Sequence, residues 1–116
     1  MTFGKHIREV REAKKATDKS FSVRQVAQRI GIEPAYLSKI ERDEMSPPGE
    51  ETTKKLAAEL ELDADVLLAI GGKVSTDLQE IIRKRPKLFA DLIRELKGVP
   101  DNAILRIVRE VRDGDW

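Results

Sequence analysis

The stretch from Ser22 to Arg42 constrains the fold of this chain more than any other part of it. Apolar residues recur at helical spacing in its first half, and Ser22 stands where a helix N-cap is expected. Gly31 can adopt the positive φ that ends one helix and redirects the chain. Pro34 suits the first turn of a second helix, because its missing N–H is not needed there. The stretch therefore predicts two short helices joined by a tight turn.

The second of these helices is predicted to have an apolar face and a polar, basic face. Leu37 and Ile40 are expected to point to the core, whereas the outward residues are Tyr36, Ser38, Lys39 and Arg42. A short helix held across another helix, with such an outer face, is how a helix-turn-helix presents side chains to the major groove of DNA.

This stretch resembles the Cro/C1-type (XRE) helix-turn-helix proteins. The pattern that carries the resemblance is S-V-x-x-V-A-x-x-I-G-I-x-x-x-Y-L-S-K-I-E-R, followed by Ser46-Pro47-Pro48 and by LAAELEL at 56–62. The resemblance covers roughly residues 3 to 71. It implies an all-α fold, with a five-helix lambda-repressor-like DNA-binding domain over residues 1–72. A small C-terminal helical bundle of two to three helices would follow over residues 73–116.

The rest of the chain is also predicted to be helical, because it is rich in Ala, Leu, Glu, Lys and Arg and shows no strand-like alternation. Helices are expected over 3–15, 50–61, 64–70, 76–85, 86–97 and 102–112, with Asp63 and Asp101 as N-caps. Residues 73–75, after Gly71-Gly72, are expected to form a hinge. The loop at 16–21 is longer than the family's. Lys14, Lys15 and Lys19, which lie along it, either contact phosphate or the minor groove, or are solvated on a tolerated surface insertion.

Charge and cysteine content limit the function classes. The net charge is only +1, but residues 1–45, which include the predicted DNA-facing helix, are the most basic part of the chain. The chain has no cysteine, no signal-peptide segment and no apolar run near the roughly 18–20 residues that span a bilayer. We therefore expect a cytoplasmic protein that does not bind membranes.

No group of residues suggests catalysis. His6 is the only histidine, and Ser38 has no matching histidine base. The carboxylates alternate with lysine and arginine, as on solvated helix faces, and there is no glycine-rich phosphate loop. The sequence therefore predicts no enzyme, no metal site and no cofactor.

The resemblance implies that Pro34, Ala35 and Lys39 occupy base-reading positions. The first two side chains can only touch thymine methyl groups, so Lys39 is expected to be the main polar reader, most simply of guanine. Ser38 and Tyr36 are expected to help, although Tyr36 could instead be half-buried with its hydroxyl on a phosphate. The residues expected to contact DNA phosphates are Arg42, Arg24, Gln25, Gln28 and Ser22.

The resemblance also implies a structural ion pair between Arg11 and Glu41. Arginine offers a rigid fork of donors, and a partly buried carboxylate needs such a partner. The alternative is that Arg11 is a solvated surface residue.

The last two predicted helices carry too many apolar side chains for all of them to remain exposed to solvent. These side chains must pack together, on the first unit, or on another chain. We expect them to pair with a second protomer, although docking on the N-terminal unit is the alternative. The predicted dimerisation residues are Leu88, Phe89, Leu92, Ile93, Leu96, Ile104, Leu105, Ile107, Val108 and Val111.

These features predict a sequence-specific, DNA-binding transcriptional repressor that acts as a homodimer on a palindromic operator of double-stranded DNA. The resemblance further suggests relief of repression through cleavage of the C-terminal region by a partner metallopeptidase of the ImmA/IrrE type, in a stress or defence operon. An alternative is an antitoxin whose C-terminal helices bind a toxin. A protein-only adaptor that has lost DNA binding is disfavoured, because Lys39 and Arg42 are retained.

Overall fold

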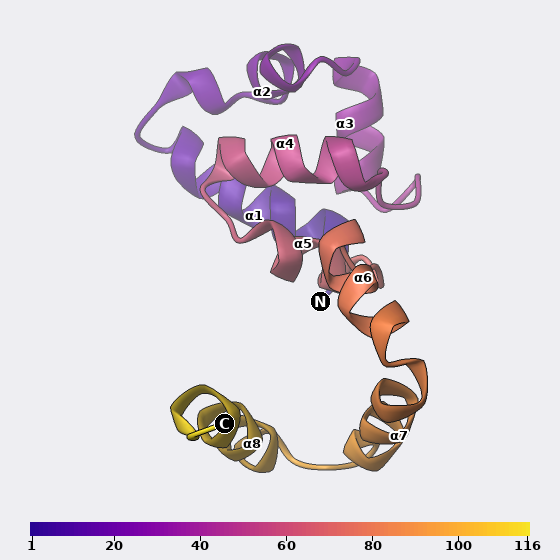
Figure 1. Ribbon diagram of the computed structural model, residues 1–116. Coiled ribbons are helices and arrows are strands. Elements are labelled where there is room, and N and C mark those ends of the chain that lie inside the picture. Colours follow the sequence, from indigo (N-terminus) through magenta and orange to yellow (C-terminus); the bar gives the residue numbers. More distant parts are fainter. The chain divides into compact units, whose positions relative to one another are not determined.

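The computed structural model describes all 116 residues and confirms the all-α fold (Figure 1). None of its helices combines the length and the apolar character that crossing a bilayer requires. A short 3₁₀ helix, η1, covers Lys19–Phe21. The α-helices are α1 (Phe3–Lys15), α2 (Val23–Ile30), α3 (Pro34–Glu41), α4 (Glu50–Leu60), α5 (Ala64–Ile70), α6 (Thr76–Lys84), α7 (Pro86–Leu96) and α8 (Asp101–Asp113).

Local sequence signals account for most helix ends. The side chains of Thr2, Ser22 and Asp63 accept hydrogen bonds from backbone N–H groups in the first turns of α1, α2 and α5. Asp101 differs from the expectation, because it is the first residue of α8 and Pro100 holds the N-cap position. Glu61 ends α4 in the left-handed conformation, with a φ of 58°.

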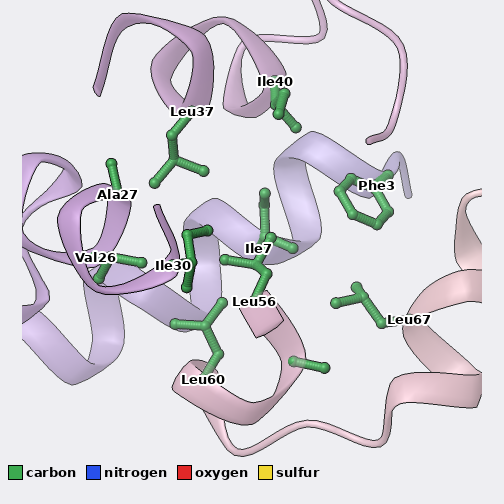
Figure 2. Close-up of a cluster of buried hydrophobic side chains, with 11 residues drawn as sticks. Phe3, Ile7, Val26, Ala27, Ile30, Leu37, Ile40, Leu56, Leu60 and Leu67 are labelled. Carbon is green, nitrogen blue, oxygen red and sulfur yellow. The ribbon is translucent and has the colours of Figure 1, made fainter. Parts of the chain in front are cut away.

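The chain divides into two compact units, residues 1–76 and 77–116. The first unit has a continuous apolar core to which each of α1 to α5 contributes (Figure 2). Burial of these side chains is the main force that holds the five helices together. The core consists of Phe3, Ile7, Val26, Ala27, Ile30, Leu37, Ile40, Leu56, Ala57, Leu60 and Leu67.

The segment between α1 and α2 is more closely packed than a solvated insertion would be. It ends in η1, and the half-buried side chain of Phe21 packs against the core. Lys14 Nζ lies 5.6 Å from the centre of the Phe21 ring, and Arg29 Cζ lies 5.2 Å from it. Both distances suit cation–π contacts. Phe21 thus anchors the segment to α1 and α2, a role that neither sequence-based alternative included.

The stretch after α5 is tied to the first unit, whereas the sequence suggested a hinge there. Lys73 Nζ donates to the carbonyl oxygen of Pro48 at 2.9 Å. The backbone N–H of Thr76 donates to Glu50 Oε1 at 2.8 Å, and its hydroxyl also bonds to this carboxylate. Ser75 is buried. Residues 73–76 therefore belong to the first unit.

The second unit contains no buried residue. Its helices are amphipathic, yet their apolar faces remain accessible: Leu88 is 66% exposed and Val111 is 61% exposed. Of the ten predicted dimerisation residues, Phe89, Leu96 and Ile104 are half-buried and the other seven are exposed. The second unit thus leaves an apolar surface that it does not cover by itself.

Candidate nucleic-acid interface

A short turn, residues 31–33, joins α2 to α3, which are labelled in Figure 1. Gly31 has a φ of 77°, in the left-handed region. The N–H of Ile32 donates to the carbonyl of Ala27 at 3.0 Å, and the N–H of Gly31 donates to the carbonyl of Gln28 at 3.2 Å. These bonds satisfy the free carbonyls at the end of α2. Pro34 then opens α3, so the turn has the geometry of a helix-turn-helix.

The two faces of α3 differ in burial. Leu37 and Ile40 lie in the core with almost no exposure. The residues predicted to read bases lie on the remaining surface: Ala35 and Lys39 are exposed, and Pro34, Tyr36 and Ser38 are half-buried. Tyr36 also packs against the core. The structure therefore brings these five residues together on the accessible side of one helix.

The predicted phosphate-binding residues of α2 lie at its first two turns. Arg24, Gln25 and Gln28 are exposed, while Ser22 is half-buried. The hydroxyl oxygen of Ser22 accepts from the backbone N–H of Gln25 at 3.2 Å, so this side chain serves as the N-cap.

Arg42, at the end of α3, is exposed and makes two side-chain bonds. Its Nη1 donates to Ser38 Oγ at 2.6 Å, and its Nη2 donates to Glu44 Oε2 at 3.0 Å. The bond with Glu44 raises the pKa of Arg42 and lowers the pKa of Glu44. Because Ser38 and Arg42 are hydrogen-bonded to each other, they do not act as two independent contact residues.

A buried ion pair joins α1 to the end of α3. Arg11 donates from Nε to Glu41 Oε2 at 2.7 Å and from Nη2 to Glu41 Oε1 at 2.8 Å. The side chains are 3% and 5% exposed. Arg11 also donates to the Phe21 carbonyl at 3.1 Å and to Glu12 Oε1 at 3.1 Å. The hydrogen bond with Glu41 is the main reason why the pKa of Arg11 is raised. The two hydrogen bonds from the guanidinium group of Arg11 to Glu41 fix the position of the C-terminal end of α3 relative to α1.

Two residues near this pair were not singled out from the sequence. Arg8 and Glu12 of α1 line a cavity beside Ser38 and Arg42 of α3. Helical spacing places Arg8 and Glu12 on one side of α1, but no sequence rule indicates that this side lies next to the end of α3. The structure contains no group of three or more His, Cys, Asp or Glu side chains arranged to hold a metal ion.

Comparison with known proteins gives concordant results. The family described as "Helix-turn-helix domain" matches residues 4–70. The chain is 39% identical over 79 residues to an uncharacterised HTH-type transcriptional regulator, RghRB, of Bacillus subtilis (strain 168). That match covers 68% of this chain and 53% of the relative, so the chain spans about half the length of that protein.

A solved structure, a SinR protein/SinI protein complex, has a similar fold. The similarity has a TM-score of 0.52 and covers 98% of this chain and 100% of the other, at 20% sequence identity. The fold and the resemblance to Cro/C1-type helix-turn-helix proteins are therefore confirmed.

Proposed function

This chain belongs to the helix-turn-helix domain family, Cro/C1 type, and on that premise we propose that it is a sequence-specific transcriptional repressor. It is a DNA-binding regulator and not an enzyme. In the proposed mode it binds a palindromic operator as a homodimer. The observation that carries the proposal is the accessible face of α3, which is polar and basic and is backed by a buried apolar face.

In this proposal, α3 enters the major groove and few side chains read bases. Pro34 and Ala35 have no hydrogen-bonding groups on their side chains, so they contribute contact with thymine methyl groups and shape. Lys39 is exposed in the last turn of α3, and it serves as the main polar reader. Arg42 binds a phosphate, together with Arg24, Gln25, Gln28 and Ser22 at the start of α2.

Selection of bound sequences from random duplex DNA, followed by affinity measurements on the selected and scrambled duplexes, tests this division of roles. Lys39→Ala should relax the preference at one base position, at a cost of about 1–3 kcal/mol for the selected site. Arg42→Ala should weaken binding to all duplexes alike and lower the salt dependence by about one counterion per protomer. If both variants only scale the affinity uniformly, Lys39 is not a base reader.

We assign the exposed apolar faces of α7 and α8 to homodimer formation. The support is that residues 77–116 have no core of their own, although large aliphatic groups such as Leu88 and Val111 remain exposed. Two copies of such helices can bury these faces against each other. Pairing two DNA-binding units then raises operator affinity, because the second half-site contact becomes intramolecular.

Light scattering of the full chain tests the dimer. Leu88→Asp should give a monomer with weaker operator binding, because it places a charge in the dimer contact. Ala90→Asp is the matched control, since it adds the same charge at another exposed position of α7 and should stay dimeric. A wild-type monomer that becomes a complex only with the product of a neighbouring gene would favour the antitoxin alternative instead.

Relief of repression by proteolysis follows from the same arrangement, if affinity depends on dimer formation. Cleavage within residues 77–116 by an ImmA/IrrE-type metallopeptidase would then separate the two DNA-binding units. Limited proteolysis in this region should lower operator affinity. Unchanged affinity after cleavage would contradict this mode of regulation.

A further inference from the structure

A cavity of about 200 Å³ lies between α1, the start of α2 and the end of α3. It is lined by Arg8, Arg11, Glu12, Val23, Ser38, Glu41 and Arg42. Three of these residues are arginines and two are glutamates, so their charges sum to +1. Within a chain that is almost neutral, this cavity concentrates donors that suit an anion.

The charged residues that line the cavity differ in how far they are free to bind an anion. Glu41 is engaged by Arg11 through both carboxylate oxygens, and Arg11 also donates to Glu12. Arg11 is therefore nearly saturated with acceptors and holds the wall of the cavity in place. Its pair with Glu41 neutralises the one buried carboxylate.

Arg8 differs from Arg11 because it is exposed and has no carboxylate within ion-pair distance. It sits one helical turn before Glu12, but Glu12 bonds to Arg11. Arg42, which lines the cavity from the end of α3, is oriented by its bond to Ser38 Oγ and shares only a solvent-exposed contact with Glu44. Arg8 and Arg42 are thus two guanidinium groups that face one cavity and can accept a new anionic partner.

The position of the cavity suggests which anion it takes. Val23, the first residue of α2, lines it, so the positive end of the α2 dipole lies beside the two arginines. Ser38 and Arg42 belong to the end of α3, the helix assigned to the major groove. A group bound here would therefore lie at the edge of the proposed protein–DNA contact, where the DNA backbone passes.

We propose that this cavity binds one phosphate group of the DNA backbone, with Arg8 of α1 and Arg42 of α3 as its two arginine ligands. The inference rests on the proposed function and adds α1 to the DNA-binding surface. Bidentate guanidinium donors match phosphate geometry, and a phosphate would replace the exposed Glu44 contact of Arg42. Glu12, whose side chain is about half-exposed, is the one group in the cavity that opposes this binding.

The test is a salt titration of the affinity of the full chain for the selected operator duplex. Arg8→Gln should lower the slope of log K against log salt by about 0.9 per protomer, or about 1.8 for a dimer. The corresponding loss of affinity is roughly fivefold per protomer at physiological salt. Base preference should not change, because a phosphate contact carries no sequence information.

A second variant should change the affinity for DNA in the opposite direction, so misfolding cannot imitate its effect. Glu12→Gln keeps an oxygen that accepts from Arg11 but removes a negative charge, and it should raise affinity about two- to fivefold. Lys55→Gln is the matched control for Arg8→Gln: it removes one exposed positive charge from α4, which does not line the cavity, and should leave the slope unchanged. Melting temperatures of all variants should stay close to the wild type.

The outcomes separate this inference from the proposed function. If the wild type binds the selected duplex but Arg8→Gln behaves like Lys55→Gln, the inference is wrong and the proposed function stands. If the wild type binds no duplex, both are wrong. A parallel titration with inorganic phosphate identifies the source of the anion. Weaker phosphate binding by Arg8→Gln without any change in the DNA slope would assign the cavity to a free phosphate and overturn the assignment to DNA.

Discussion

Removal of Arg11 should destabilise the first unit more than any other change to a charged residue. In Arg11→Met the carboxylate of Glu41 loses both of its guanidinium donors while its side chain remains 5% exposed. The Phe21 carbonyl loses a donor as well. Breaking one side of a buried ion pair in this way typically costs about 3–5 kcal/mol. The total stability of a domain this size is of the same order, so this loss should be a large fraction of the free energy of unfolding of the first unit.

The cost should be unequal for the two partners. In Glu41→Gln, Arg11 still donates to the Phe21 carbonyl, to Glu12 and to the new amide oxygen. We therefore expect a loss of only about 1–3 kcal/mol, the usual cost of weakening a buried hydrogen-bonded group. Arg11→Met combined with Glu41→Leu should recover most of the stability, because an apolar pair of similar volume leaves no stranded charge.

Urea unfolding of the full chain, followed by far-ultraviolet circular dichroism, measures these differences. The near-ultraviolet signal reports mainly on the first unit, because Tyr36, the only tyrosine, packs against that core, whereas Trp116 is 90% exposed. A double-mutant cycle of Arg11→Met, the single variant Glu41→Leu and the variant that carries both changes then yields the coupling between the two side chains. A loss below about 1 kcal/mol for Arg11→Met, or a double variant that loses the sum of the Arg11→Met and Glu41→Leu losses, would contradict the explanation by a stranded charge.

Three further changes have defined outcomes. Gly4→Ala should destabilise the first unit by about 1–3 kcal/mol or more, because the new Cβ would meet the Ile40 carbonyl oxygen at 2.1 Å, and thermal melting measures this loss. Glu61→Gly should stabilise it by up to about 1 kcal/mol in urea unfolding, because glycine adopts the left-handed conformation at the end of α4 without strain. The pKa of Glu50 is lowered by hydrogen bonds from Lys54 and then Thr76, so its stabilising contribution is present above the ordinary carboxyl range and is lost as the pH falls through the lowered pKa. Glu50→Gln should accordingly melt below the wild type at neutral pH, and the difference should close as the pH falls below the lowered pKa of Glu50.

Gly4→Ala and Glu61→Gly each have a matched control. Gly49→Ala adds a Cβ that meets no atom within 4 Å and should change stability by no more than about 1 kcal/mol. Glu61→Gln removes the surface ion pair with Lys14 but keeps a side chain on the left-handed residue, so it separates that small contribution from the backbone effect. A Gly4→Ala protein as stable as the wild type, a destabilised Glu61→Gly protein, or a pH-independent gap for Glu50→Gln would contradict the respective argument.

Local signals in the sequence were sufficient to predict most of the helices. Ser22, Gly31 and Pro34 mark the ends of α2 and α3 because capping and φ preferences act within a few residues. The sequence-based bounds of α4 and α7 differ from the observed ones by only one residue. The predicted N-cap at Asp101 was wrong by one residue, and the cause is again local, since proline and aspartate both suit the start of a helix.

Interactions between distant segments were harder to anticipate. Phe21 lies in a segment without helical periodicity, so nothing in its neighbourhood indicated that its ring would pack on the core beside Lys14 and Arg29. The bonds of Thr76 to Glu50 are equally non-local, and the glycines before them suggested a hinge instead. In both cases the partner lies on another helix, and only the packing of the helices selects it.

The sequence by itself determined that the chain is helical and that α2 and α3 form a helix-turn-helix, because periodicity, capping and glycine or proline conformation depend on near neighbours. It also marked the outward side chains of α3, such as Lys39. Only the tertiary structure decided that Arg8 and Arg42 face one cavity beside the buried Arg11–Glu41 pair. That outcome depends on how α1 crosses the end of α3, which the apolar core sets and no local pattern encodes.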